Sequence, residues 1–229
     1  MAQSRANRTY RIRVPYNPRM KAATIKPHAP LPVTHEQPAA EAHLVQACRV
    51  MAHLIQQYGS CQIGQHQSPP FETLTSSIIS QQLSAKAART IKQRVMTITG
   101  DFTARSFLDA SPLELRSAGL SSAKLRYILA LAAYADEGGL TIDILRRQSD
   151  EEVVLTLTQL PGIGRWTAEM FLIFCLKRPD VLALGDAGLR RATRLLYGET
   201  AKLEDVASAW RPHASTASWY LWRHLDAGM

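Results

Sequence analysis

A tight turn at residues 160–164, with the sequence Leu-Pro-Gly-Ile-Gly, has residue types that suggest a binding function. It lies between two stretches with helical patterning, and the second opens with Arg-Trp-Thr-Ala at residues 165–168. Two glycines around one apolar residue allow a hairpin so tight that backbone N–H groups face outward at a helix N-terminus. Such groups bind a phosphate oxygen without lysine side chains. A Gly-x-Gly turn alone is also a common helix–helix connection, but the whole string is more specific.

A carboxylate, Asp186, follows this turn and stands just before another helical pattern. An Asp in that place is most often an N-cap. A carboxylate can also stabilise positive charge that develops in a reaction and orient or deprotonate a water molecule. Glu169 lies in the first turns of the helix after the hairpin and is a second candidate for this chemistry, although exposure to solvent or stabilisation of that helix is the favoured role.

Helices must position these groups, because apolar residues recur at helical spacing along most of the chain. The series from Leu44 to Tyr58 predicts one helix over residues 39–59. Further helices are predicted over residues 71–79, 84–100, 111–119, 121–138, 142–147, 150–157, 165–176, 187–197 and 216–225. The sequence shows no strand pattern and no internal repeat, so it predicts an all-α fold.

The formal net charge of +8 is concentrated near the N-terminus. Arginines and lysines at positions 5, 8, 11, 13, 19, 21 and 26 have no acidic neighbour before position 33, so the rest of the chain is close to neutral. We predict that residues 1–36 form a basic, disordered tail and that residues 37–229 form the folded domain. The tail either follows DNA phosphates or is a solubilising or targeting leader.

Several classes of protein are disfavoured by composition. No apolar run reaches the length of a membrane span, and no signal-peptide pattern opens the chain. The three cysteines are widely spaced, which argues against a disulfide framework and against a four-cysteine metal or iron–sulfur site. This composition is typical of an intracellular protein.

The residues around the turn resemble the helix–hairpin–helix motif of the base-excision DNA glycosylase superfamily. That family places its catalytic aspartate after the hairpin at the start of the next helix, and residues 182–192 match this segment with Asp186 in that place. The strings at 78–84, 119–124 and 219–223 are similar to the 3-methyladenine DNA glycosylase II, or AlkA-like, branch. The resemblance implies a compact, two-lobed helical fold with the active-site cleft between the lobes.

The resemblance also implies a set of site residues. The catalytic residue is Asp186, and the base pocket contains Trp166, Met170 and Trp222. DNA contacts come from the hairpin and from the break near residue 82, namely Leu160, Gly162, Ile163, Gly164, Thr167, Gln81, Gln82, Leu83 and Ser84. Within the break, Gln82 aligns best with the intercalating residue, and Leu83 is the alternative. Met170 and Ala214 depart from residues frequent in the family, which leaves the base preference open.

The implied activity is hydrolysis of the N-glycosidic bond of alkylated bases such as 3-methyladenine and 7-methylguanine, in base-excision repair. Relatives that also nick the strand carry a lysine where this chain has Trp166, so a monofunctional enzyme is expected. Two alternatives remain: a non-catalytic helix–hairpin–helix module that binds DNA damage, and a glycosylase for another damaged or mismatched base.

The expected partner is double-stranded DNA containing damaged bases, and no membrane. We expect a monomer located with DNA in the bacterial cytoplasm or nucleoid. No cofactor is required, although the resemblance implies a monovalent cation, Na⁺ or K⁺, at the hairpin carbonyls.

Overall fold

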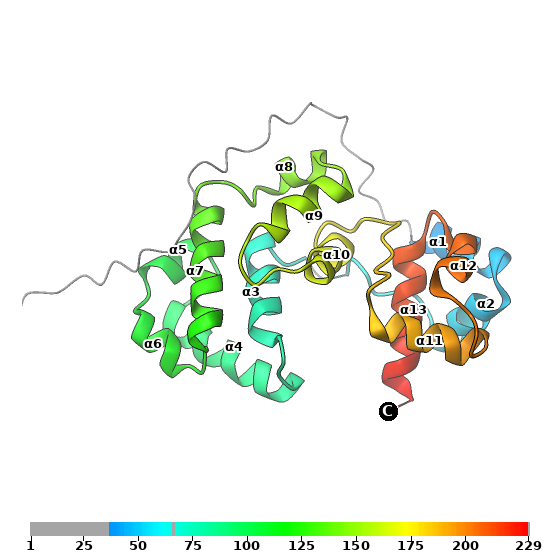
Figure 1. The fold of residues 1–229 in the computed structure, drawn as a ribbon, viewed down its shortest axis with the longest axis horizontal. Helices are drawn as coiled ribbons and strands as arrows, with labels where there is room; N and C mark the ends of the chain where they lie inside the picture. The colour runs from blue at the N-terminus through cyan, green and yellow to red at the C-terminus, as the bar shows by residue number, and fades with distance from the viewer. Residues whose placement is uncertain (1–36, 66, 229) are drawn as a thin grey trace, which may run out of the picture.

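The computed structural model describes residues 37–65 and 67–228, so the predicted tail lies outside the described residues. Within them the chain is helical and contains no strand, as the sequence predicts (Figure 1). The helices are α1 (Gln37–Ala47), α2 (Arg49–Tyr58), α3 (Pro70–Ser80), α4 (Ala85–Thr99), α5 (Ala104–Asp109), α6 (Pro112–Ser117), α7 (Ser122–Asp136), α8 (Ile142–Arg147), α9 (Asp150–Thr158), α10 (Arg165–Phe174), α11 (Ala187–Tyr197), α12 (Leu203–Ala207), the 3₁₀ helix η1 (Ser208–Trp210) and α13 (Ala214–Ala227). None of these helices combines the length and apolar character that a membrane span requires.

The helices form two lobes (Figure 1). The first lobe contains α3 to α10, and the second contains α11 to α13 together with α1 and α2 from the start of the described chain. In the second lobe, the Tyr220 hydroxyl donates to the Gly59 carbonyl at 2.8 Å and to Glu41 Oε1 at 3.0 Å. These bonds fasten α13 to the N-terminal helices, so segments distant in sequence complete one lobe.

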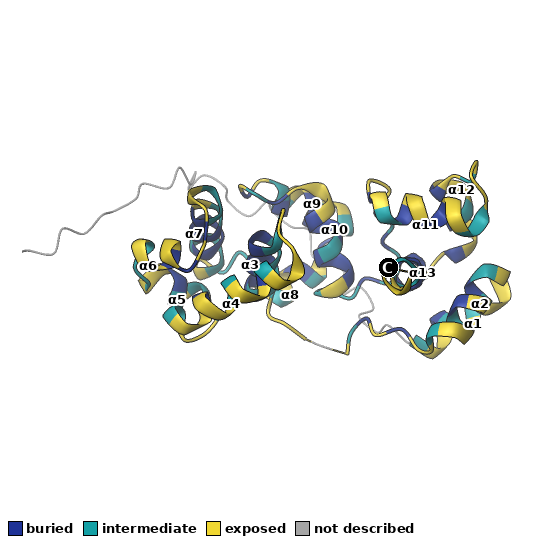
Figure 2. Cartoon of the chain, turned by 90° about the horizontal axis from the view of Figure 1, so that it is seen from below, coloured by how far each residue is buried: buried dark blue, intermediate teal, exposed yellow. Residues whose placement is uncertain are grey.

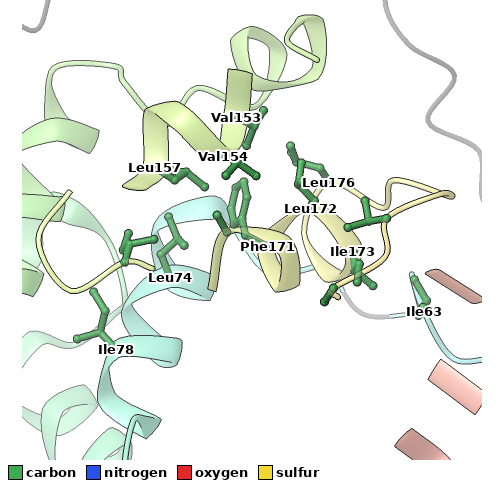
Figure 3. Close-up of a cluster of buried hydrophobic side chains, with 14 of the residues drawn as sticks. Ile63, Leu74, Ile78, Val153, Val154, Leu157, Phe171, Leu172, Ile173 and Leu176 are labelled. Carbon is green, nitrogen blue, oxygen red and sulfur yellow. The ribbon is translucent and has the colours of Figure 1, made fainter. Parts of the chain in front are cut away.

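The core of the first lobe lies where α3, α9 and α10 meet (Figure 3). Leu74, Leu157 and Phe171 come from these three helices and are almost fully buried. Figure 2 shows that each of these helices has buried residues on one side and exposed residues on another. This packing holds α9 and α10, the two helices on either side of the hairpin, at a fixed angle to α3.

The prediction of one helix over residues 39–59 is wrong, because α1 ends at Ala47 and α2 begins at Arg49. Cys48 between them is extended, with φ −152° and ψ 119°. The apolar positions Leu44, Met51 and Leu54 are all buried, so the periodic pattern runs across the break without revealing it. The short helices α5 and α12 were also not predicted, since a helix of one or two turns carries little periodic signal.

The hairpin is built by short-range backbone bonds at the end of α9. The N–H of Leu160 donates to the Leu157 carbonyl at 3.0 Å, and that of Ile163 donates to the Leu160 carbonyl at 3.2 Å. Gly162 has φ 84°, a conformation that favours glycine, and a Cβ at this position would overlap the ring of Tyr127 on α7. The turn therefore requires glycine for its backbone and for its packing.

Truncating the core of the first lobe is expected to destabilise the protein. Leu157→Ala should lower the free energy of unfolding by about 2–5 kcal/mol, because the buried side chain leaves a cavity. Leu155→Ala on the same helix is the matched control, since Leu155 is 57% exposed, and its effect should stay within about 0.5 kcal/mol. Urea unfolding followed by circular dichroism measures both. Equal effects would contradict the packing described here.

The two hairpin glycines should differ in the same measurement. Gly162→Ala is expected to cost about 2 kcal/mol or more, because the new methyl group meets Tyr127 and the positive φ is strained. Gly164 has φ −93° and open space around its Cβ position, so Gly164→Ala should leave the unfolding free energy nearly unchanged. A Gly162→Ala variant as stable as Gly164→Ala would show that Tyr127 does not close over the turn.

Candidate active site

The N-terminus of α10 presents backbone N–H groups that have no acceptor within the helix. Gly164 is the N-cap and has no side chain to accept a hydrogen bond, so the first N–H groups of α10 are left for an external acceptor. The first helical bond runs from Ala168 N–H to the Gly164 carbonyl at 3.1 Å. This is the geometry of an anion site at a helix N-terminus.

Several predicted DNA-binding residues of the hairpin have buried side chains. Leu160, Ile163 and Thr167 are 3%, 5% and 6% exposed, whereas Gly164 is exposed. Any DNA contact from Leu160 or Ile163 must therefore use their backbone groups. Thr167 also lines a cavity described below.

The segment between α3 and α4 lies against the hairpin. Gln81 Nε2 donates to the Gly162 carbonyl at 2.9 Å and thereby ties the two predicted DNA-binding segments together. Gln82 has φ 57°, and Gln82 and Leu83 are both exposed. Ser84 caps α4 by accepting from the Ala87 N–H at 3.3 Å. Both candidates for the intercalating residue thus stand at an exposed turn.

Lys124 stabilises the segment between α3 and α4 through hydrogen bonds. Its ammonium donates to the carbonyls of Ile79 at 2.8 Å and Gln81 at 2.7 Å, at the end of α3. Burial lowers the pKa of the Lys124 amine. Lys124 belongs to the string at residues 119–124. That string alone does not predict that Lys124 stabilises the segment between α3 and α4, because the two segments are distant in sequence.

Asp186 is the N-cap of α11 and is 7% exposed. Its Oδ1 accepts from the Leu189 N–H at 2.7 Å and from Trp222 Nε1 at 3.2 Å. Its Oδ2 accepts from Trp166 Nε1 at 2.6 Å. The helix cap expected for an Asp in this place is therefore present, and two indole N–H groups hold the same carboxylate.

The two tryptophans reach Asp186 from different lobes. Trp166 lies on α10 in the first lobe, and Trp222 lies on α13 in the second. Trp222 also packs against Phe174 of α10, with ring centroids 5.9 Å apart. The carboxylate is thus placed where the lobes meet, with an aromatic ring from each lobe beside it.

A cavity of about 220 Å³ lies between α3 and α10. Its wall includes Met170 and Phe174 on α10 and the hydroxyl-bearing Ser77 and Ser80 on α3. A neighbouring pocket shares these two serines and is closed by Gln82 and Trp166. Met170, a predicted pocket residue, thus lines a cavity, and Phe174 is a wall residue that the sequence analysis did not identify.

Glu169 is buried, at 8% exposed, and not solvent-exposed, but its ion pair with Arg165 four residues earlier on α10 agrees with the other expected role, stabilisation of that helix. Its Oε1 accepts from Arg165 Nε at 3.1 Å, and the same guanidinium makes a two-pronged bond to Glu151 at 3.1 and 2.9 Å. Burial raises the pKa of Glu169, an effect that Arg165 opposes and that the charges of Glu151 and Asp186 reinforce. Arg165 is thus paired with two carboxylates and is not left as a free cation beside the hairpin.

The described residues contain no group of three or more His, Cys, Asp or Glu side chains arranged to hold a metal ion. The ionisable side chains nearest the hairpin are already paired with one another, as in the Arg165 network. The site brings together the Asp186 carboxylate and the indole N–H donors of Trp166 and Trp222.

Comparison with known proteins places the chain in a family. The family model described as "HhH-GPD superfamily base excision DNA repair protein" matches residues 75–211. DNA-3-methyladenine glycosylase 1 of Schizosaccharomyces pombe is 34% identical over 166 residues, which cover 67% of this chain and 72% of the relative.

Solved structures agree with this match. The crystal structure of a DNA-3-methyladenine glycosidase from Bacillus halodurans has a TM-score of 0.72 at 35% identity, and covers 82% of this chain and 89% of its own. The S. pombe 3-methyladenine DNA glycosylase Mag1, in complex with abasic DNA, has a TM-score of 0.71 at 32% identity. The match covers 81% of this chain and 95% of the Mag1 chain. The chain belongs to the HhH-GPD superfamily of base excision DNA repair proteins.

Proposed function

We propose that this protein is a monofunctional DNA glycosylase that hydrolyses the N-glycosidic bond of alkylated bases, of the 3-methyladenine and 7-methylguanine type, in double-stranded DNA. The observation that carries the proposal is the Asp186 carboxylate, which indole N–H groups from both lobes hold, one of them from Trp166 in the wall of a pocket. The names of its relatives, which are 3-methyladenine glycosylases, support the substrate class.

Asp186 acts on the sugar. As the bond between C1′ and the base nitrogen breaks, its electron pair goes to the base and positive charge develops on the sugar. The negative carboxylate stabilises that charge and orients a water molecule, whose oxygen bonds to C1′ while its proton passes through the carboxylate to solvent. A cationic alkylated purine becomes neutral as it leaves, so no general acid is needed.

The base must leave the helix stack before it reaches this carboxylate. The exposed turn at Gln82 and Leu83 supports a role in filling the space that the base vacates. The N–H groups at the start of α10 bind a phosphate of the same strand, which fixes the DNA relative to Asp186. The cavity bounded by Met170 and Phe174 receives the base, with Trp166 and Trp222 as further aromatic surfaces.

Trp166 supports hydrolysis without strand cleavage. A lyase step requires an amine that attacks C1′ and forms a Schiff base. The indole of Trp166 has no nucleophilic amine, and its N–H donates to Asp186 Oδ2. The product is accordingly an intact strand with an abasic site.

Three finer points belong to the same proposal. The turn carbonyls of Leu160 and Gly162 each accept one hydrogen bond and keep a second lone pair, which suits a monovalent cation such as Na⁺ or K⁺. The protein acts as a monomer. It is located with the DNA of a bacterial cell.

Replacing the carboxylate should abolish activity. Asp186→Asn keeps the size of the side chain and an oxygen for the cap, but removes the charge that stabilises the sugar cation. Single-turnover release of 3-methyladenine and 7-methylguanine from methylated duplex DNA should fall by about 100-fold or more. The wild-type product should be abasic DNA that remains un-nicked until treated with alkali.

The alternatives predict other results. Robust release by Asp186→Asn would leave Asp186 as a helix cap only. Binding of damaged DNA without release of any base by wild type would support the non-catalytic module. Release of an oxidised or mismatched base, with alkylated bases untouched, would assign a different substrate class.

The hydrogen bond from Trp222 to Asp186 can be tested separately from the aromatic surface that Trp222 provides. Trp222→Phe keeps an aromatic surface but removes the 3.2 Å bond to Oδ1, so the single-turnover rate should fall by roughly 10-fold with little change in half-saturation. Trp219→Phe on the same helix is the matched control and should retain the wild-type rate. Equal rates for both variants and wild type would show that this bond does not position the carboxylate.

A further inference from the structure

A lysine lines the cavity between α3 and α10, which adjoins the pocket that Trp166 lines. Lys92 on α4 contributes to the wall of this cavity opposite Met170 and Phe174 of α10. It also borders the two neighbouring pockets along the same face of α3, where Glu72 lies. Within the described part of the chain, no hydrogen bond or ion pair involves the Lys92 ammonium, and the charge of Glu72 acts on it only from a distance.

The cavity is bracketed by the two tryptophans that hold Asp186. Trp166 closes the adjoining pocket, which shares Ser77 and Ser80 with the cavity. Trp222 packs on Phe174, which belongs to the cavity wall. When a base enters this space, its sugar and Asp186 lie on the side of the two tryptophans. Lys92 then lies on the wall that α4 provides.

The charges on these two groups match the change that the reaction makes. During bond cleavage, positive charge moves from the base to the sugar, or negative charge develops on the base when the base starts out neutral. A carboxylate at the sugar and an ammonium at the base both favour that movement. The ammonium also repels a cationic base in the ground state, which the aromatic rings offset by cation–π attraction.

The desolvated position of Lys92 strengthens this effect. Lys92 is half-buried, and burial lowers the pKa of its amine, opposed by the negative charge of Glu72. A charge that is partly removed from water interacts more strongly with its neighbours than an exposed surface lysine does. The negative charge of Glu72, which borders the same groove, favours the protonated amine.

We propose that Lys92 is a specificity-determining residue for the glycosylase reaction, whose ammonium faces the extruded base and promotes its departure at the expense of ground-state binding of cationic bases. This inference rests on the proposed glycosylase function. It adds a second charged group, on the base side, to the carboxylate on the sugar side.

The test compares Lys92→Met with wild type in single-turnover release from duplexes containing 7-methylguanine, a cationic base, or hypoxanthine, a neutral one. We expect the maximal rate to fall by about 10-fold for 7-methylguanine and further for hypoxanthine, whose departing base is anionic. Half-saturation for the 7-methylguanine duplex should occur at a lower enzyme concentration than in wild type. Lys92→Arg keeps the charge and should restore most of the rate.

Two controls separate this role from a contact with the DNA backbone. Affinity for a duplex with a tetrahydrofuran abasic analogue, which has no base, should be unchanged in Lys92→Met. Arg94→Met removes a charge from an exposed position on the same helix that lines none of these pockets and should leave the rates unchanged. Lys92→Gln provides a second neutral variant in case Lys92→Met does not fold.

The inference is overturned if the neutral variants release both bases at the wild-type rate. It is also overturned if they lose affinity for the tetrahydrofuran duplex at unchanged rates, or if Arg94→Met reproduces their effect. Failure of wild type to release any base would instead refute the proposed function, and this inference with it. Activity that depends on Asp186 but not on Lys92 refutes only the role of Lys92.

Discussion

A nearly buried carboxylate needs hydrogen-bond donors for its oxygens, and the arrangement of this active site follows from the donors that Asp186 has. A carboxylate that leaves water without hydrogen-bond donors would cost several kcal/mol. Asp186 accepts from one backbone N–H at the start of α11 and from two indoles. Neutral donors satisfy the lone pairs without cancelling the charge, so the negative charge remains for an electron-poor sugar. Because the indoles belong to different lobes, the charge can be held in this way only when the lobes are packed together.

The folded domain also has little excess positive charge with which to hold DNA. The excess of positive charge lies almost wholly before residue 33, and the described domain is close to neutral. Arg165 stands next to the hairpin, but Glu151 and Glu169 already neutralise it. The hairpin instead offers backbone N–H groups at the start of α10, whose direction is fixed by the packing of Gly162 against Tyr127. Such a site positions a phosphate through geometry, with less dependence on net charge than a cluster of lysines would have.

In the proposed mechanism, groups of opposite charge, Asp186 and Lys92, lie on either side of the glycosidic bond. Asp186 lies at the sugar and Lys92 lines the cavity for the base, while Met170 and Phe174 form its apolar wall. Charged groups that the fold already holds in place do not have to reorient during the reaction. They therefore stabilise the transition state effectively in a site that is partly shielded from water. In this view, Phe174 provides an aromatic wall one turn beyond Met170.

The sequence by itself determined the features that depend on neighbouring residues. The hairpin glycine, the cap of α11 by Asp186 and the cap of α4 by Ser84 are decided within a few residues, so local chemistry predicts them. The all-helical fold follows from periodicity in the same way, and the resemblance of ordered motifs identified the family.

Only the tertiary structure decided which of these groups meet. Trp222 reaches Asp186 across 36 positions in sequence, and Gln81 reaches Gly162 across 81. Periodicity ran through the break at Cys48, because the residues on both sides face one core. The burial of Glu169 and the place of Lys92 in the cavity wall depend on the helices that pack over them. A single sequence carries no local signal for such contacts, since their free energy arises from surfaces that come together only when the chain folds.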